Sequence, residues 1–208
     1  MISVTGFQID SIEVTNAQYA GFLAAQPDPS LQPPACASNA TFEPSQGWPA
    51  TGQEALPVTN TDWCDARAFC HWARKHLCGA VGGGASSYDD FANANTDQWQ
   101  RACTGAGARN YPYGNTYEAA TCNGSDQGSN QKVPAGEVSC QGAYPGLFDM
   151  SGNVWEWEDA CQSDAVGALC RIRGGCFLNG APNLRCDTDS STSRLDSHPT
   201  VGFRCCRD

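Results

Sequence analysis

The sequence predicts an α+β fold, and three observations lead to this prediction. The first half carries helical apolar patterns, whereas the second half alternates short apolar runs with turns rich in glycine and asparagine. Charged residues make up only 16% of the chain, and its 22 glycines and 12 prolines favour loops over long helices. Thirteen cysteines are dispersed along the chain. We therefore expect two or three short helices, short antiparallel strands and much irregular structure, held together by disulfides.

The predicted elements follow one another in a simple order. Residues 7–14 predict a strand, and Thr15 is a suitable N-cap for the helix that follows it. A second helix follows Thr61, where apolar residues recur at helical spacing. A glycine-rich linker over residues 81–96 precedes a third short helix over residues 96–103.

The last strands are expected over residues 171–177 and 202–206, after a turn-rich stretch. The chain has 208 residues, the size of one ordinary domain, and no internal boundary divides it. We therefore expect a single domain over residues 1–208. Its net charge of −10 argues against nucleic acid as a partner, because phosphate recognition needs a basic face. No apolar run predicts membrane insertion, and nothing in the sequence indicates the oligomeric state.

The cysteines indicate an oxidising compartment. None of them forms a CxxC pair, so a zinc ribbon and a thioredoxin-like redox motif are excluded. Residues 1–10 carry neither a basic start nor an apolar stretch, so we expect that an export signal is missing from this chain. An extracellular or cell-surface location follows, with a cytoplasmic protein that keeps its thiols reduced as the alternative. Because thirteen is odd, at least one cysteine is free or pairs with another chain.

A series of motifs identifies a family resemblance. The chain contains, in order, "IEVTNAQYAGFL", "PVTNTDWCDARAFCHWA", "TDQWQRAC", "YPYGN", "PGLFDMSGNVWEW", "RIRGGCF" and "VGFRC". This order resembles the formylglycine-generating enzyme family, also called the sulfatase-modifying factor domain, from about Phe7 to Cys206. The resemblance implies a modified C-type-lectin-like fold with calcium as a structural ion.

The resemblance leaves the function open, because the family has several. Some members are copper-dependent oxidases that convert a sulfatase cysteine to formylglycine, and relatives use non-haem iron. Others have no known activity and are exported. A further set comprises variable proteins of diversity-generating retroelements, which bind ligands through the C-terminal surface of this fold. The fold alone therefore does not assign the function, which depends on the residues of the site.

The oxidase interpretation meets a clear mismatch. Oxidases of the family carry a C-x4-C pair that starts two residues beyond the aromatic of the "RGG" strand, since paired thiolates hold Cu(I). Here Asn179 stands at the first of these positions, and the second cysteine has no counterpart. Cys176 replaces a serine that is common in the family, and Cys176 with Cys186 is the weak candidate for a substitute copper pair. The alternatives are a disulfide at Cys186 with Cys176 unpaired, or a nonstandard bridge at Cys176. Copper and iron are not expected.

Calcium is the metal that the sequence favours. Calcium takes several hard oxygen ligands, including backbone carbonyls, on a tight loop. In the segment "SGNVWEW" two residues offer side-chain oxygens and three offer carbonyls, and a shortened stretch upstream offers a second set. The predicted ligands are Asn153 and Glu156 with Ser151, Gly152 and Val154, and then Asn123 and Gly124.

The segment between "RGGCF" and "VGFRC" is rich in small polar residues and is predicted to bind a ligand. Substitution of adenines in asparagine-type codons yields a similar mixture of small polar residues. Substitution of the adenine in a serine codon (AGC to TGC) can likewise encode the cysteine at position 176. The chain is therefore expected to be a non-catalytic domain that recognises a protein or another extracellular ligand. An altered thiol oxidase and a structural module of a cell-surface protein are the alternatives. The predicted ligand-binding residues are Leu178, Asn179, Ala181, Asn183, Asp187, Asp189, Ser191, Leu195, Asp196, His198 and Thr200.

Overall fold

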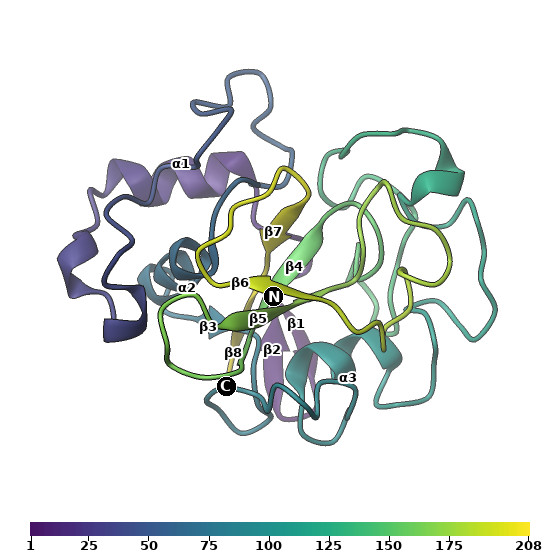
Figure 1. The fold of residues 1–208 in the computed structure, drawn as a ribbon. Helices are drawn as coiled ribbons and strands as arrows, with labels where there is room; N and C mark the ends of the chain where they lie inside the picture. The colour runs from purple at the N-terminus through teal and green to yellow at the C-terminus, as the bar shows by residue number, and fades with distance from the viewer.

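A computed structural model describes residues 1–208. The three α-helices are short, and eight short strands separate into two four-stranded sheets (Figure 1). The helices are α1 (Asn16–Ala24), α2 (Trp63–Trp72) and α3 (Gln98–Thr104). The strands are β1 (Ile2–Val4), β2 (Phe7–Ile9), β3 (His76–Leu77), β4 (Trp155–Cys161), β5 (Leu169–Arg173), β6 (Ser191–Ser193), β7 (Val201–Phe203) and β8 (Cys205–Arg207). The predicted α+β class with much irregular structure is confirmed.

The first sheet has the order β1-β2-β8-β3, which brings both ends of the chain together, and the second has the order β6-β5-β4-β7. All pairs are antiparallel except β4 with β7, which run parallel from Trp155↔Val201 to Trp157↔Phe203. This pair departs from the predicted antiparallel arrangement. The chain leaves β5, passes through β6 and returns as β7 on the far side of β4, so residues 155–203 supply every strand of the second sheet.

The helices begin close to their predicted starts. Thr15 caps α1 and forms a capping box with Gln18. The cap of α2 is Asp62 and not Thr61, because Asp62 and Asp65 exchange side-chain-to-backbone hydrogen bonds. Beyond its last residue, Arg74 has a φ of +58°, which ends the helical path before β3.

Two strand predictions were too long. The strand predicted over residues 7–14 stops at Ile9, and the strand predicted over residues 171–177 stops at Arg173. In the second case Gly174 and Gly175 both have positive φ values, of +87° and +75°, which turn the chain out of the sheet. The strand predicted over residues 202–206 is two strands, β7 and β8, and these belong to different sheets.

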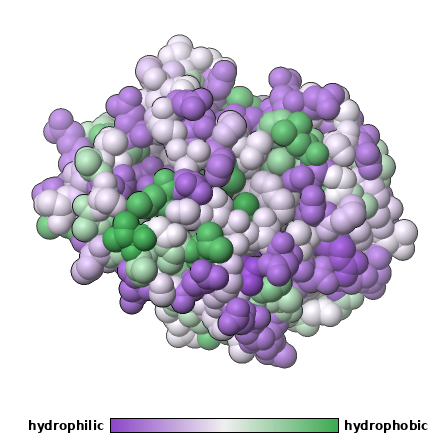
Figure 2. Space-filling model, viewed as in Figure 1, coloured by the Kyte–Doolittle hydropathy of each residue, from purple (hydrophilic) through white to green (hydrophobic).

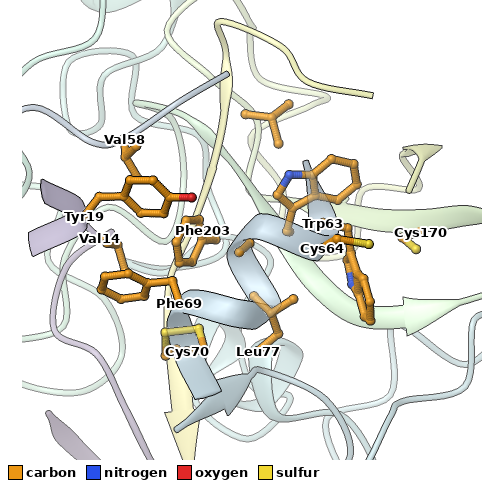
Figure 3. Packing of buried hydrophobic residues seen from close by; sticks show 14 of the residues in the cluster. Val14, Tyr19, Val58, Trp63, Cys64, Phe69, Cys70, Leu77, Cys170 and Phe203 are labelled. Atoms are coloured by element: carbon orange, nitrogen blue, oxygen red, sulfur yellow. A yellow bond between two sulfur atoms is a disulfide. The ribbon is translucent and has the colours of Figure 1, made fainter. Parts of the chain in front are cut away.

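An aromatic core lies between α1, α2 and β7 (Figure 3). Tyr19 stacks on Phe69 with ring centroids 5.6 Å apart, and Phe69 meets Phe203 edge-on at 5.4 Å. The hydroxyl of Tyr19 donates to the carbonyl of Phe42 at 2.7 Å, so its polar end is satisfied inside the core. A second cluster around Trp99 packs α3 against the first sheet.

Six disulfides involve twelve of the thirteen cysteines. Two of them, Cys70–Cys205 and Cys78–Cys206, attach the C-terminal strand β8 to α2 and to the residue after β3. The disulfide-rich character that the sequence predicts is therefore confirmed. None of the helices is both long enough and apolar enough to cross a bilayer.

Candidate functional site

The residues between β5 and β7 form two loops joined by the short strand β6. We call residues 177–200 the C-terminal surface. In Figure 1 they are the lime-to-yellow chain in front of and beside β4 and β5. Of the predicted ligand-binding residues, Leu178, Asn183, Asp187, Asp189, Asp196 and His198 are exposed, whereas Asn179, Ala181, Ser191, Leu195 and Thr200 are partly buried.

Each carboxylate of the C-terminal surface has its own hydrogen-bond partner. Asp187 accepts hydrogen bonds from Arg185 at 2.7 and 2.8 Å, which lower its pKa. Asp189 pairs with Arg171, and Asp196 accepts from the hydroxyl of Thr192 at 2.8 Å. No hydrogen bond or ion pair joins these three carboxylates to one another. This arrangement suits a polar contact surface better than a pair of catalytic carboxylates.

A tyrosine cluster lies beside the C-terminal surface, and the sequence analysis did not include it. Tyr111 stacks on Tyr113 with centroids 5.6 Å apart, and Tyr117 tilts against Tyr111 at the same distance. The hydroxyl of Tyr111 donates to the carbonyl of Ala181 at 3.2 Å, which joins the cluster to the first loop. Partly exposed tyrosines next to small polar residues are typical of protein-recognition surfaces. The three tyrosines within "YPYGNTY" were the available signal.

Cys176 is the one free cysteine and is buried. Burial raises the pKa of its thiol, so the reactive thiolate is disfavoured. Cys186 forms a disulfide with Cys103 on α3, so the interpretation of Cys186 as a disulfide-bonded residue is confirmed. Asn179 accepts a hydrogen bond from the backbone N–H of Cys176 at 2.9 Å, which gives this asparagine a structural contact. The substitute copper pair of Cys176 with Cys186 does not form, because Cys186 has no thiolate to offer.

The segment predicted to bind calcium is buried, but its main side-chain ligands are engaged. Glu156 accepts from Arg204 at 2.7 Å on each of its two oxygens, and one of these also accepts the indole N–H of Trp99 at 2.8 Å. Asn153 donates to Glu13 at 2.9 Å, and its side-chain oxygen accepts from Asn123 and from the backbone of Val133. Both side chains are therefore part of a buried hydrogen-bond network.

The remaining predicted calcium residues make contacts that join the segment at residues 151–157 to its neighbours. The hydroxyl of Ser151 donates to the carbonyl of Leu184 at 2.6 Å. Gly152 has a φ of +76° and lies so close to Asn123 that a Cβ would stand 2.5 Å from its carbonyl oxygen. Val154 is buried, and Gly124 lies against Leu184. The two predicted calcium segments therefore pack against each other.

Two carboxylates that the sequence analysis missed have oxygens without partners. Glu13 and Asp149 are both buried, and one oxygen of each, Oε2 of Glu13 and Oδ1 of Asp149, has no hydrogen-bond partner in the structure. Burial raises the pKa of Asp149 to about 6 and raises that of Glu13 well above its usual value, with the neighbouring carboxylate adding to the rise for Glu13. Glu13 lies beyond the end of β2, so strand alternation does not predict its burial, and its role depends on contact with a distant segment.

These orphaned oxygens are further candidate ligands for a cation. No group of three His, Cys, Asp or Glu side chains is arranged to hold a metal, so a calcium ion here would need backbone carbonyls as well. Glu13 and Asp149 would supply the carboxylate oxygens, and Gly152 and Val154 are the nearby predicted carbonyl donors. Calcium binding through Asn153 and Glu156 stays a prediction, and Glu13 and Asp149 are two further candidate ligands.

A protein-family comparison matches the whole chain. The model described as "Sulfatase-modifying factor enzyme 1-like domain" matches residues 1–208. The bovine "Inactive C-alpha-formylglycine-generating enzyme 2" is 28% identical over 166 residues, covering 72% of this chain and 50% of that protein. The "Formylglycine-generating enzyme" of Streptomyces coelicolor is also 28% identical, covering 76% of this chain and 54% of the relative. The chain thus spans about half the length of these two relatives.

Solved structures show the same fold. CarF has a TM-score of 0.65 and PvdO from Pseudomonas aeruginosa a TM-score of 0.64, each at 20% identity and covering 97% of this chain. The match covers 86% of CarF and 80% of PvdO. The "Treponema denticola variable protein 1" has a TM-score of 0.60 at 20% identity, over 97% of this chain and 84% of that one. With six disulfides and few helices, the fold is the predicted disulfide-rich, C-type-lectin-like arrangement.

Proposed function

We propose that this chain, which belongs to the sulfatase-modifying factor enzyme 1-like domain family, is a non-catalytic recognition domain that binds an extracellular ligand through its C-terminal surface. The state of the cysteines is the observation that carries the proposal. Twelve are in disulfides, and the remaining Cys176 is buried beside Asn179 instead of a second thiol. Copper-dependent thiol oxidation needs two thiolates close together. This chain offers one thiol, and its burial favours the protonated form.

The exposed residues around this position support a binding role. Leu178 has 58% of its surface exposed, and Asn183, Asp187 and Asp189 of the same segment are exposed as well. On the face shown in Figure 2, hydrophilic and neutral residues predominate and the hydrophobic areas are separated. Such a mixed surface suits a reversible interaction with a polar partner such as a protein.

Some of the relatives support a non-catalytic role. Two mammalian relatives carry the word "inactive" in their names, and one structural neighbour is called a variable protein. We extend the proposal to sequence diversification of residues 177–200. The strands on either side, β5 and β7, would keep their places while these residues vary. An adenine-substituted near-copy of the corresponding coding segment beside the gene is then expected, and its absence would contradict diversification while leaving ligand binding intact.

Location and calcium are further parts of the proposal. Six disulfides suit an extracellular or cell-surface protein, because disulfides persist in oxidising compartments. A structural calcium ion at Glu13 and Asp149 would neutralise two carboxylates that otherwise lie buried side by side. Calcium should raise the unfolding temperature of the wild-type protein, EDTA should reverse this, and Glu13→Gln should abolish the response. A wild-type protein that is indifferent to both reagents would contradict the calcium site.

A copper titration combined with a thiol count tests the non-catalytic assignment. The native protein should show no accessible thiol, the denatured protein should show one, and Cu(I) should bind no more tightly than to Cys176→Ser. With a cysteine-containing peptide, Cu(I) and oxygen, no aldehyde product should form. Tight stoichiometric Cu(I) binding that Cys176→Ser abolishes, or aldehyde formation by the wild type alone, would establish the oxidase instead.

A further inference from the structure

A pocket outside the C-terminal surface has its own chemical character. It has a volume of about 200 Å³ and lies between the loop around Trp48 and the segment at Thr59 and Asn60. Lys132 forms one wall, and Pro199 is the single contribution from the C-terminal surface. Because a water molecule occupies about 30 Å³ in the liquid, there is room for a group of a few heavy atoms.

Lys132 is a cation without a carboxylate partner. The chain has only two lysines, and the other one, Lys75, forms a salt bridge with Asp10 at 2.6 Å. The ammonium group of Lys132 donates to the carbonyl of Pro57 at 3.0 Å and to the hydroxyl of Thr59 at 2.7 Å. An ammonium group has three N–H donors, so one is left for a ligand. Burial lowers the pKa of Lys132 to about 8, and an anion would offset this cost of burial.

Asn60 adds an acceptor to the same pocket. Its side-chain N–H donates to the carbonyl of Gln46 at 3.4 Å, while its side-chain oxygen is buried and has no partner. A buried oxygen without a hydrogen bond is costly, so a ligand donor that reaches it after a rotation of the Asn60 side chain would stabilise it. Trp48 also lines the pocket and supplies an aromatic side chain. The pocket therefore offers a cation, an acceptor and an apolar side.

We propose that this pocket binds a small carboxylate that carries an N–H group beside it, as the C-terminal residue of a peptide does. The carboxylate accepts from Lys132, the adjacent N–H donates to Asn60, and the rest of the residue packs against Trp48. A charge-assisted hydrogen bond from Lys132 supplies most of the selectivity for an acid over a neutral amide. In a chain with a net charge of −10, a local cation is also what allows an anion to approach.

A pair of matched probes tests this proposal. N-acetylglycine carries the carboxylate and the adjacent N–H, whereas N-acetylglycinamide replaces only the carboxylate. Binding is followed through the indole N–H signal of Trp48 by NMR titration. N-acetylglycine should saturate the wild-type pocket and bind at least tenfold more tightly than the amide. Equal binding of the two probes, or no saturable shift with either, overturns the proposal.

The two lysines provide a matched pair of variants. Lys132→Met should weaken binding of N-acetylglycine at least tenfold, whereas Lys75→Met should leave it unchanged. If Lys132→Met unfolds, the wild-type protein gives the same answer by acylation and peptide mapping. N-acetylglycine should then slow acylation of Lys132 and not of Lys75, and equal rates with and without the probe contradict the site. Because the C-terminal surface contributes only Pro199, failure here leaves the proposed recognition surface standing.

Discussion

The C-terminal surface and the strands β4 and β5 differ in how their charged side chains are paired. In the strands β4 and β5, Glu156 and Arg173 are fully buried and bonded to partners from other elements. On the C-terminal surface, Asp187 and Asp189 pair with arginines but keep much of their side chains exposed. An ion pair at the surface contributes little to the free energy of unfolding. In the interior the pair is essential, since a buried charge without a partner is costly. The fold therefore depends more on the buried pairs of these strands than on the exposed pairs of the C-terminal surface.

The largest effect is expected where a buried charge loses its partner. Arg204→Met leaves Glu156 buried without its bidentate partner, which should cost about 3–5 kcal/mol of unfolding free energy. The surface counterpart, Arg185→Met, removes the exposed pair with Asp187 and should cost about 0–1 kcal/mol. Urea unfolding of both variants measures the contrast. Similar losses in the two would show that the strands and the surface are equally sensitive.

The next effect concerns the disulfide that ties the C-terminal surface to α3. Replacing both Cys103 and Cys186 with alanine should cost about 2–4 kcal/mol, because the bridge closes a loop with a sequence separation of 83. The matched control removes Cys161–Cys170, whose separation is only 9, and should cost less. Thermal unfolding under non-reducing conditions compares the two. A larger loss from the shorter loop would mean that chain entropy does not govern these bridges.

More of the fold than of the site could be predicted from the sequence, because local features determine parts of the fold. The caps at Thr15 and near Thr61 are local features, so the sequence places α1 and α2 almost correctly. The separation of β7 from β8 depends on pairing with β4 and β2, which are distant in the chain. The pairing of Glu156 with Arg204 spans 48 residues, and neither residue alone reveals it.

The same reason explains the missed carboxylates and the missed pocket. Glu13 becomes notable only beside Asp149, and Lys132 only beside Thr59. Cys176 was different, because an odd cysteine count requires an unpaired residue and the family pattern marks this position. Counting and local capping can be read from the sequence, whereas contacts between distant segments need the structure.

A smaller effect depends on pH. Burial raises the pKa of Asp62, the cap of α2, to about 6. Since this folded-state pKa exceeds the unfolded value of about 4, the stabilising contribution is complete below pH 4 and is lost as pH rises through 6. The change is at most about 1.4 kcal/mol per pH unit in that window. Asp62→Asn keeps a capping side chain but cannot titrate. Stability should therefore fall less between pH 4 and 7 in this variant, and an unchanged pH profile would contradict the assignment to Asp62.

The smallest effects are expected on the C-terminal surface itself. Leu178→Ser, Asn183→Ala and His198→Ala each change an exposed residue, and each should alter the unfolding free energy by no more than about 0.5 kcal/mol. Leu184→Ala is the matched control, because this neighbouring side chain is buried with 2% exposure and should cost about 2–5 kcal/mol. Urea unfolding of the four variants decides the matter. A surface that tolerates substitution at exposed positions while its buried neighbour does not can vary without loss of the fold. A loss above 2 kcal/mol at the three exposed positions would mean that they belong to the scaffold, and diversification of this segment would then be incompatible with folding.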